Sequence, residues 1–194
     1  LQQEVGLPEL PNVPVLSLVT RLTPQKGIDL FEPIMAELME MDVQVVVLGN
    51  GYADYENYFK YCDYTYHDKF RAMIKFSAPL AQRIYAGADI FLMPSKSEPC
   101  GLAQMIAMRY GTIPVVHAVG GLKDTVIPFN PETGEGTGVT FQSFNAGDML
   151  DAIRRAIDIW KDKEQRKAIM LNAMSGDYSW NASAEEYREL YESL

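Results

Sequence analysis

The sequence predicts an α/β fold in which a doubly wound parallel sheet carries helices on both faces. Short apolar runs rich in Val, Ile and Leu alternate with longer segments whose apolar residues recur at helical spacing. The apolar runs are nearly continuous, as strands buried on both faces are. Strands that alternate with helices in this way are typical of parallel α/β sheets.

The composition fits one globular domain. The chain has 194 residues, of which 47% are hydrophobic and 22% charged, enough to bury a sizeable core. A formal net charge of −9 argues against nucleic acid as a partner, because such binding depends on cationic contacts with phosphates. The two cysteines, Cys62 and Cys100, fit a reducing compartment, and no apolar run is long enough to span a membrane. Because the chain opens at Leu1 in what reads as mid-protein sequence, we expect a fragment of a longer protein.

The first third predicts strand, helix and strand. Residues 13–20 (VPVLSLVT) and 43–48 (VQVVVL) are β-branched and apolar, as buried strands are. Between them, residues 28–41 place apolar side chains at helical spacing. This order implies parallel strands joined by a right-handed crossover.

The middle third continues the alternation. We expect helices at 53–66, 80–88 and 102–110, and strands at 70–76, 90–93 and 113–116. Pro114 favours an edge position or a strand start, because proline cannot donate a ladder hydrogen bond. Four apolar residues of the third helix are expected in the core: Leu102, Met105, Ile106 and Met108.

The last third begins with Gly120 and Gly121, which predict a second tight turn. Residues 128–138 are rich in Pro, Gly, Asn and Thr and predict an exposed loop. A brief strand at 139–141 and helices at 146–160, 163–174 and 183–194 complete the chain.

Two turns at the carboxyl ends of the predicted strands carry the candidate chemistry, since ligands of such folds bind at that edge. Arg21 and Lys26 follow the first strand and could neutralise a diphosphate while its bond to a sugar breaks. The alternative is a solvated turn with two surface cations. Glu98 follows the strand at 90–93 and could accept hydrogen bonds from sugar hydroxyls, or merely complement the dipole of the next helix.

The turn that contains Glu98 also resembles an anion site. Pro99 and Gly101 fit a helix start, where the backbone N–H groups of Gly101, Leu102 and Ala103 have no partner inside the helix and could face a phosphate. Phe76, at the end of the strand 70–76, could stack on a nucleobase or belong to the core.

Other reactive side chains offer no constellation. Cys100 has no acid–base partner in its motif, and His67 and His117 are isolated and lack metal-ligand spacing. The glycine patterns of dinucleotide folds and of Walker phosphate loops are absent.

Five motifs stand in one order along the chain: RLTPQKG at 21–27, YAGAD at 85–89, EPCGLAQ at 98–104, MRYGT at 108–112 and VGGLKDT at 119–125. In these motifs the whole chain, residues 1–194, resembles bacterial glycogen synthases and plant starch synthases. The resemblance implies the single Rossmann-like, C-terminal, nucleotide-sugar-binding domain of a two-domain GT-B glycosyltransferase. It also implies transfer of glucose from ADP-glucose to the non-reducing end of an α-1,4-glucan, with retention at the anomeric carbon and without metal or cofactor.

The resemblance implies roles by position. Arg21 and Lys26 bind the diphosphate and stabilise the departing ADP, and Glu98 contacts the glucose. The implied donor-binding residues are Phe76, against adenine, with Cys100 near the glucose and Gly101, Leu102 and Ala103 as backbone donors.

The resemblance also implies that the N-terminal acceptor domain lies outside this chain and that the helix at 183–194 packs against it. We therefore expect weak binding of ADP or ADP-glucose and no glucan elongation by these residues alone. A UDP-sugar transferase of the same fold stays open, although Ile106 stands eight positions after Glu98, where such enzymes typically carry a second Glu. So does a non-catalytic nucleotide- or glucan-binding module. The compartment is the bacterial cytoplasm, which we favour, or the plastid stroma of a plant or alga.

Overall fold

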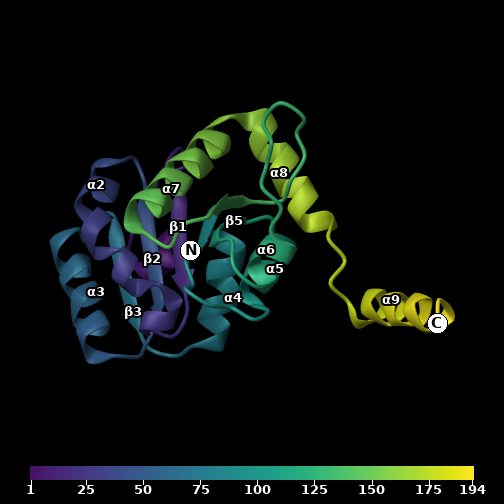
Figure 1. Cartoon of the computed structure of the whole chain (residues 1–194). Helices are drawn as coiled ribbons and strands as arrows, with labels where there is room; N and C mark the ends of the chain where they lie inside the picture. Colours follow the sequence, from purple (N-terminus) through teal and green to yellow (C-terminus); the bar gives the residue numbers. More distant parts are fainter.

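A computed structural model describes residues 1–194 and is built on one six-stranded sheet in the order β3-β2-β1-β4-β5-β6 (Figure 1). The strands are β1 (Val15–Val19), β2 (Gln44–Gly49), β3 (Phe70–Ile74), β4 (Ile90–Met93), β5 (Ile113–His117) and β6 (Val139–Phe141). Every neighbouring pair is parallel, which confirms the predicted sheet. The strand order reverses between β1 and β4, and such a switch point opens a crevice outside the carboxyl ends of the two strands.

Helices cover both faces of the sheet, as predicted. They are α1 (Gln2–Val5), α2 (Met35–Glu40), α3 (Ala53–Thr65), α4 (Ala78–Gly87), α5 (Ala103–Arg109), α6 (Gly121–Thr125), α7 (Ala146–Lys161), α8 (Lys163–Ser175) and α9 (Trp180–Glu192). One face packs against α2, α3 and α7, and the other against α1, α4, α5 and α6. None of the helices combines the length and the apolar character that a membrane crossing requires.

The strands show why their sequences are apolar without alternation. In β1, Leu16 and Leu18 face the cluster formed with α2, α3 and α7, whereas Val15 and Val19 face the opposite cluster. Each face of the sheet packs against a hydrophobic cluster, so an apolar side chain is favoured at almost every position of the strand.

Two predictions about these elements were wrong in part. Residues 28–41 do not form one helix but two short 3₁₀ turns, Ile28–Leu30 and Glu32–Ile34, followed by α2. Pro33 lacks the N–H that a continuous α-helix needs there, so only the last segment is α-helical. Pro114 is the second residue of β5, which lies between β4 and β6; the strand-start alternative is confirmed and the edge alternative is wrong.

The last helix, α9, stands apart from the body of the molecule beyond an extended linker (Figure 1) and contains no buried residue. It begins three residues before the predicted position 183. The Ser179 hydroxyl accepts a hydrogen bond from the N–H of Ala182 at 3.3 Å and thereby caps the helix start. The region 128–138 is the predicted loop, closed by an antiparallel bridge between Asn130 and Glu135.

Candidate functional site

The turn after β1 and the turn after β4 touch across the switch point. The carbonyl of Gln25 accepts the N–H of Lys96 at 2.8 Å, and the Gln25 amide donates to the carbonyl of Ser97 at 3.1 Å. Gly27 has a φ of +72°, and a Cβ at this position would overlap the carbonyl oxygen of Pro94. Only glycine allows this approach, so Gly27 is required where the two predicted turns meet.

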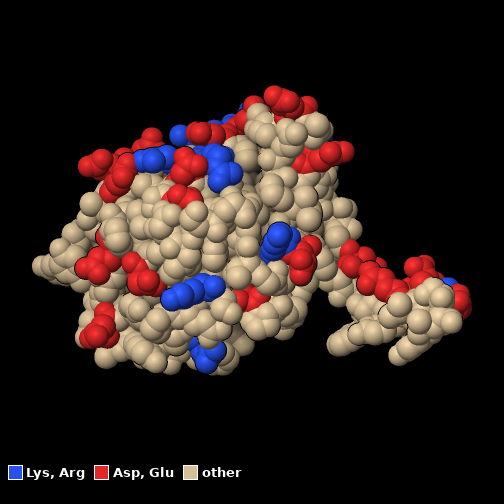
Figure 2. Space-filling view, viewed as in Figure 1, with Lys and Arg blue, Asp and Glu red and all other residues tan.

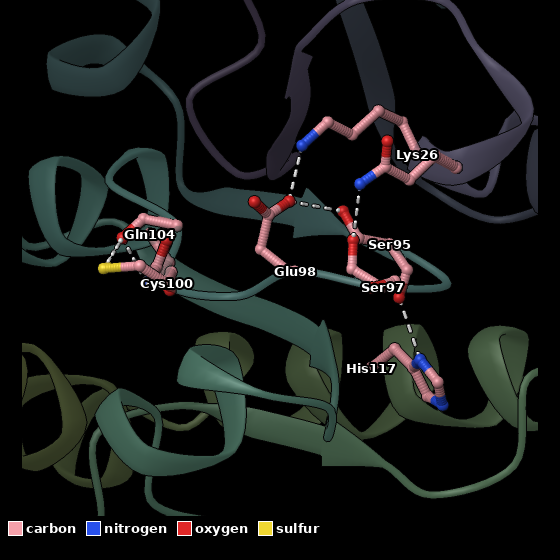
Figure 3. A network of polar contacts seen from close by, with 9 residues as sticks. Lys26, Ser95, Ser97, Glu98, Cys100, Gln104 and His117 are labelled. Atoms are coloured by element: carbon pink, nitrogen blue, oxygen red, sulfur yellow. Dashed lines mark hydrogen bonds and ion pairs between the residues drawn. The ribbon is translucent and has the colours of Figure 1, made fainter.

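Lys26 and Glu98 form a partly buried ion pair where the turns meet (Figure 3). The Lys26 Nζ donates to the Glu98 Oε2 at 2.5 Å, and the two side chains are only 15% and 11% exposed. The Ser95 hydroxyl donates to the same oxygen at 3.1 Å. Because an unpaired charge at such low exposure is strongly destabilising, each partner stabilises the other in this position.

A hollow of about 290 Å³ lies beside this pair, between the carboxyl ends of β1 and β4. The predicted turn Gly101 to Ala103 forms part of its wall. The three backbone N–H groups of this turn have no hydrogen-bond partner within the chain, and Gly101 has a φ of +76°. A cation, a carboxylate and free N–H donors at one hollow suit a ligand that carries both an anionic group and hydroxyls.

Arg21 and Phe76 lie in a second hollow of about 190 Å³. Val19 and Thr20 border both hollows, so the two adjoin each other along the same edge of the sheet. Phe76 is 86% exposed, so the expectation that it could be a core residue is wrong. The structure therefore separates Arg21 from Lys26, which the sequence had treated as one unit.

The turn after β5 supports the segment that carries Glu98. The N–H of Gly121 reaches the carbonyls of Glu98 at 3.1 Å and Pro99 at 3.2 Å. A Cβ on Gly120 would overlap the carbonyl of Glu98, and one on Gly121 would overlap that of Cys100. The predicted tight turn leads directly into α6, and the two segments meet through their main chains.

Sequence reasoning missed two residues that hold this turn. Gln104 is buried, and its amide donates to the carbonyls of Cys100 at 3.2 Å and Gly101 at 3.1 Å. The feature of the sequence that could have indicated this role is a polar residue on the apolar face of α5. His117 was set aside as isolated, yet its Nδ1 lies 2.8 Å from the carbonyl oxygen of Ser95 (Figure 3). Its signal was a polar residue at the carboxyl end of a buried strand.

The remaining predictions for α5 have mixed outcomes. Leu102 was expected in the core but is 67% exposed, because it precedes the helix at the rim of the first hollow. Met108 is fully buried, as predicted, whereas Met105 and Ile106 are partly buried. Cys100 is exposed, and its thiol donates only to the carbonyl of Gly101. No group of three or more His, Cys, Asp or Glu side chains is arranged to hold a metal ion.

Known proteins match this chain along most of its length. The family model of the glycosyl transferases group 1 matches residues 5–173. Glycogen synthase of Bacillus subtilis (strain 168) is 51% identical over 195 residues, which cover 100% of this chain and 40% of the relative. Glycogen synthase of Ligilactobacillus salivarius (strain UCC118) is 51% identical over 194 residues, which cover 100% of this chain and 41% of the relative. The chain thus spans about two fifths of the length of these relatives.

A solved structure shares the fold closely. It is the catalytic domain of starch synthase IV from Arabidopsis thaliana bound to ADP and acarbose. The TM-score is 0.88 at 36% sequence identity, and the match covers 99% of this chain and 41% of that one.

Proposed function

The chain belongs to the group 1 family of glycosyl transferases, and from this premise we propose that the whole protein is a glycogen synthase. Its fold is the Rossmann-like fold of a GT-B glycosyltransferase. The proposed reaction transfers glucose from ADP-glucose to the non-reducing end of an α-1,4-glucan with retention at the anomeric carbon. Identity of 51% along the entire chain to glycogen synthases supports this proposal.

The observation that carries the proposal is the meeting of Lys26, Glu98 and the free N–H groups of Gly101 to Ala103 at one hollow. In our proposal the diphosphate of the donor binds to Lys26 and to these N–H groups. Negative charge grows on the diphosphate as its bond to glucose breaks, and a placed ammonium stabilises that charge. Glu98 accepts hydrogen bonds from the glucose hydroxyls, so donor binding exchanges the ion pair for two contacts with the ligand.

The second hollow suits the nucleoside end of the donor. The exposed ring of Phe76 offers a stacking surface for adenine, and Arg21 lies beside it as a second cation for the diphosphate. Cys100 is exposed next to the glucose side of the turn. We expect no metal or cofactor in the reaction, because Lys26, Arg21 and the backbone donors supply the positive charge that the leaving group needs.

Residues 1–194 are, in this proposal, the donor-binding domain of the protein. A preceding domain binds the glucan acceptor, and α9 packs against that domain. The absence of any buried residue from α9 supports such a contact. We place the reaction in the bacterial cytoplasm, in line with the bacterial glycogen synthases among the relatives.

The test compares the complete protein with the 194-residue chain. With ADP-glucose and glycogen, the complete protein should release ADP and lengthen the glucan, whereas the chain alone should bind ADP weakly by calorimetry and elongate nothing. Tighter binding of UDP-glucose than of ADP-glucose would indicate a UDP-sugar transferase instead. Binding without turnover by the complete protein would indicate a module that only binds.

A further inference from the structure

We propose that His117 is a positioning residue of the donor site, which fixes the carboxylate of Glu98 through Ser95. The proposal rests on the proposed function, because it takes the hollow beside Lys26 and Glu98 as the place where the sugar nucleotide binds. It adds a residue from the end of β5 to a site that the turns after β1 and β4 otherwise form.

The ring of His117 is held in one orientation. His117 is 8% exposed and packs against the rings of Phe141 and Phe144, with centroids 5.3 Å and 5.4 Å away. Its Nδ1 lies 2.8 Å from the carbonyl oxygen of Ser95, and its Nε2 lies 3.3 Å from that of Gln142. Both neighbouring oxygens are carbonyls, which only accept hydrogen bonds, and Nδ1 makes the shorter contact; we therefore assign a proton to Nδ1, which donates to Ser95.

Ser95 passes this constraint on to Glu98. Ser95 is fully buried, forms part of the wall of the first hollow, and donates its hydroxyl to the Glu98 Oε2. Figure 3 shows the resulting series of contacts from His117 through Ser95 to Glu98 and Lys26. It joins the carboxyl ends of β5, β4 and β1.

The constraint becomes important when the donor binds. In the proposed reaction Lys26 turns to the diphosphate, and the Ser95 hydroxyl is then the side-chain donor from the protein that still holds the Glu98 carboxylate. The position of the Ser95 hydroxyl must then be set by an element that does not contact the ligand. The hydrogen bond from His117 to the Ser95 carbonyl supplies it.

Three variants in the complete protein separate the two ring nitrogens. His117→Asn keeps an N–H at the place of Nδ1, His117→Gln keeps one at the place of Nε2, and His117→Phe keeps a ring without either. We expect kcat/KM for ADP-glucose to fall about tenfold in the Phe and Gln variants, as for one lost hydrogen bond, and most of this loss to be recovered in the Asn variant. The KM for glucan should change little in all three, and the melting temperature should fall by only a few degrees, as for the loss of a buried hydrogen bond, to a similar extent in the Asn and Gln variants. His67→Phe, at the other histidine of this chain, lies on the exposed surface beside Asp68 and should match the wild type.

Several outcomes would overturn the proposal. One is an equal loss of kcat/KM for ADP-glucose in the Asn and Gln variants. Another is a loss of kcat/KM that runs parallel to the fall in melting temperature across the variants. The third is a KM for glucan that rises as much as that for ADP-glucose. Nitrogen-15 NMR of labelled histidine gives a readout that is independent of activity: His117 should carry its proton on Nδ1, and a proton on Nε2 alone would contradict the inference. A wild-type protein that is inactive on ADP-glucose while His117 shows the Nδ1 proton would reject the proposed function, and the donor-site role with it, while leaving the hydrogen bond to Ser95 established.

Discussion

At the scale of single residues, Lys26 and Glu98 have opposite charges and low exposure, and each is the nearest counter-charge of the other. Such a pair is kept in place by mutual neutralisation, and removal of one member leaves the other unpaired. Substitution of the lysine and substitution of the glutamate should therefore have different effects on the binding of a phosphate ligand, although both residues belong to one contact.

Substitutions of the pair should show this difference. Lys26→Ala should weaken ADP binding to the 194-residue chain by about 10- to 100-fold, the loss typical of a hydrogen bond to a charged group. Glu98→Gln frees the ammonium of Lys26, so ADP should bind at least as tightly as in the wild type, while turnover of the complete protein falls because the sugar contact is weakened. Calorimetry and ADP release measure the two effects. Equal weakening of ADP binding by both substitutions would contradict the assigned roles.

Asp89 is a residue whose role lies in stability. It directly precedes β4, at the amino-terminal ends of the strands and so on the side of the sheet opposite the site. There its carboxylate accepts the N–H of Val15 at 2.8 Å and the indole N–H of Trp160 at 2.9 Å. Burial raises the pKa of this carboxyl above its ordinary value, although both hydrogen bonds act in the opposite direction. The partly buried acid in the YAGAD motif thus ties β1 and α7 to the start of β4.

The raised pKa sets the sign of a pH effect. The stability that this carboxyl contributes is fully present below its ordinary pKa and is lost as the pH rises through the raised value. We therefore expect the difference in unfolding free energy between the wild type and Asp89→Asn to shrink as the pH rises across the acidic range and then to level off. Urea unfolding of both proteins at a series of pH values measures this difference. The contributions of the other titrating groups to the unfolding free energy are the same in both proteins and cancel. A difference that grows with pH would show that the two hydrogen bonds, rather than burial, dominate.

At the scale of elements, the turn after β5 positions the turn after β4 through main-chain contact. Gly120 has a φ of +50°, and both glycines lie directly beneath the backbone from Glu98 to Cys100. Side chains cannot adjust to relieve a clash of this kind, because the atoms concerned belong to the backbone. The geometry of the proposed donor site therefore depends on α6, an element that contains none of its predicted residues.

A methyl group at Gly121 should disturb both stability and binding. Gly121→Ala should cost about 1–3 kcal/mol of unfolding free energy, as overpacking does, and should weaken ADP binding because the turn after β4 must shift. The matched control is Gly147→Ala in α7, where the nearest atom would lie 3.4 Å away; it should change stability by no more than about 1 kcal/mol and leave ADP binding unchanged. Thermal unfolding and calorimetry test both. Normal ADP binding in the Gly121 variant would remove the turn after β5 from the site.

At the scale of the whole molecule, acidic side chains outnumber basic ones, and one helix stands apart from the body. Figure 2 shows many acidic groups and few basic ones over the visible face, in line with the net charge of −9. An anionic ligand is therefore not attracted by the overall field but bound by the local donors at the switch point. The helix α9 lies apart from this body and presents exposed aromatic side chains, among them Trp180, Tyr187 and Tyr191.

Removal of α9 should leave the rest of the molecule intact. A chain that ends at Ser179 loses no buried residue, so its melting temperature should stay within about 3 °C of the full chain and its affinity for ADP should not change. It should also associate less with itself in sedimentation experiments, because large exposed apolar side chains are lost. A marked fall in melting temperature would mean that α9 packs onto the body in solution.

Local sequence patterns predicted most of the elements, the turns and the family, but not the break of the predicted helix at 28–41 into two 3₁₀ turns and α2. Apolar periodicity, Pro99, Gly101 and the five motifs act over a few residues, so local pattern was sufficient to predict β1, β4 and the two turns that carry the candidate chemistry. How these parts combine follows from the packing of the chain. β1 lies beside β4, Lys26 bonds to Glu98 72 positions away while Arg21 borders a different hollow, and His117 supports Ser95. These outcomes depend on strand order and register, which arise from the packing of the whole chain and leave no periodic signal in any one segment.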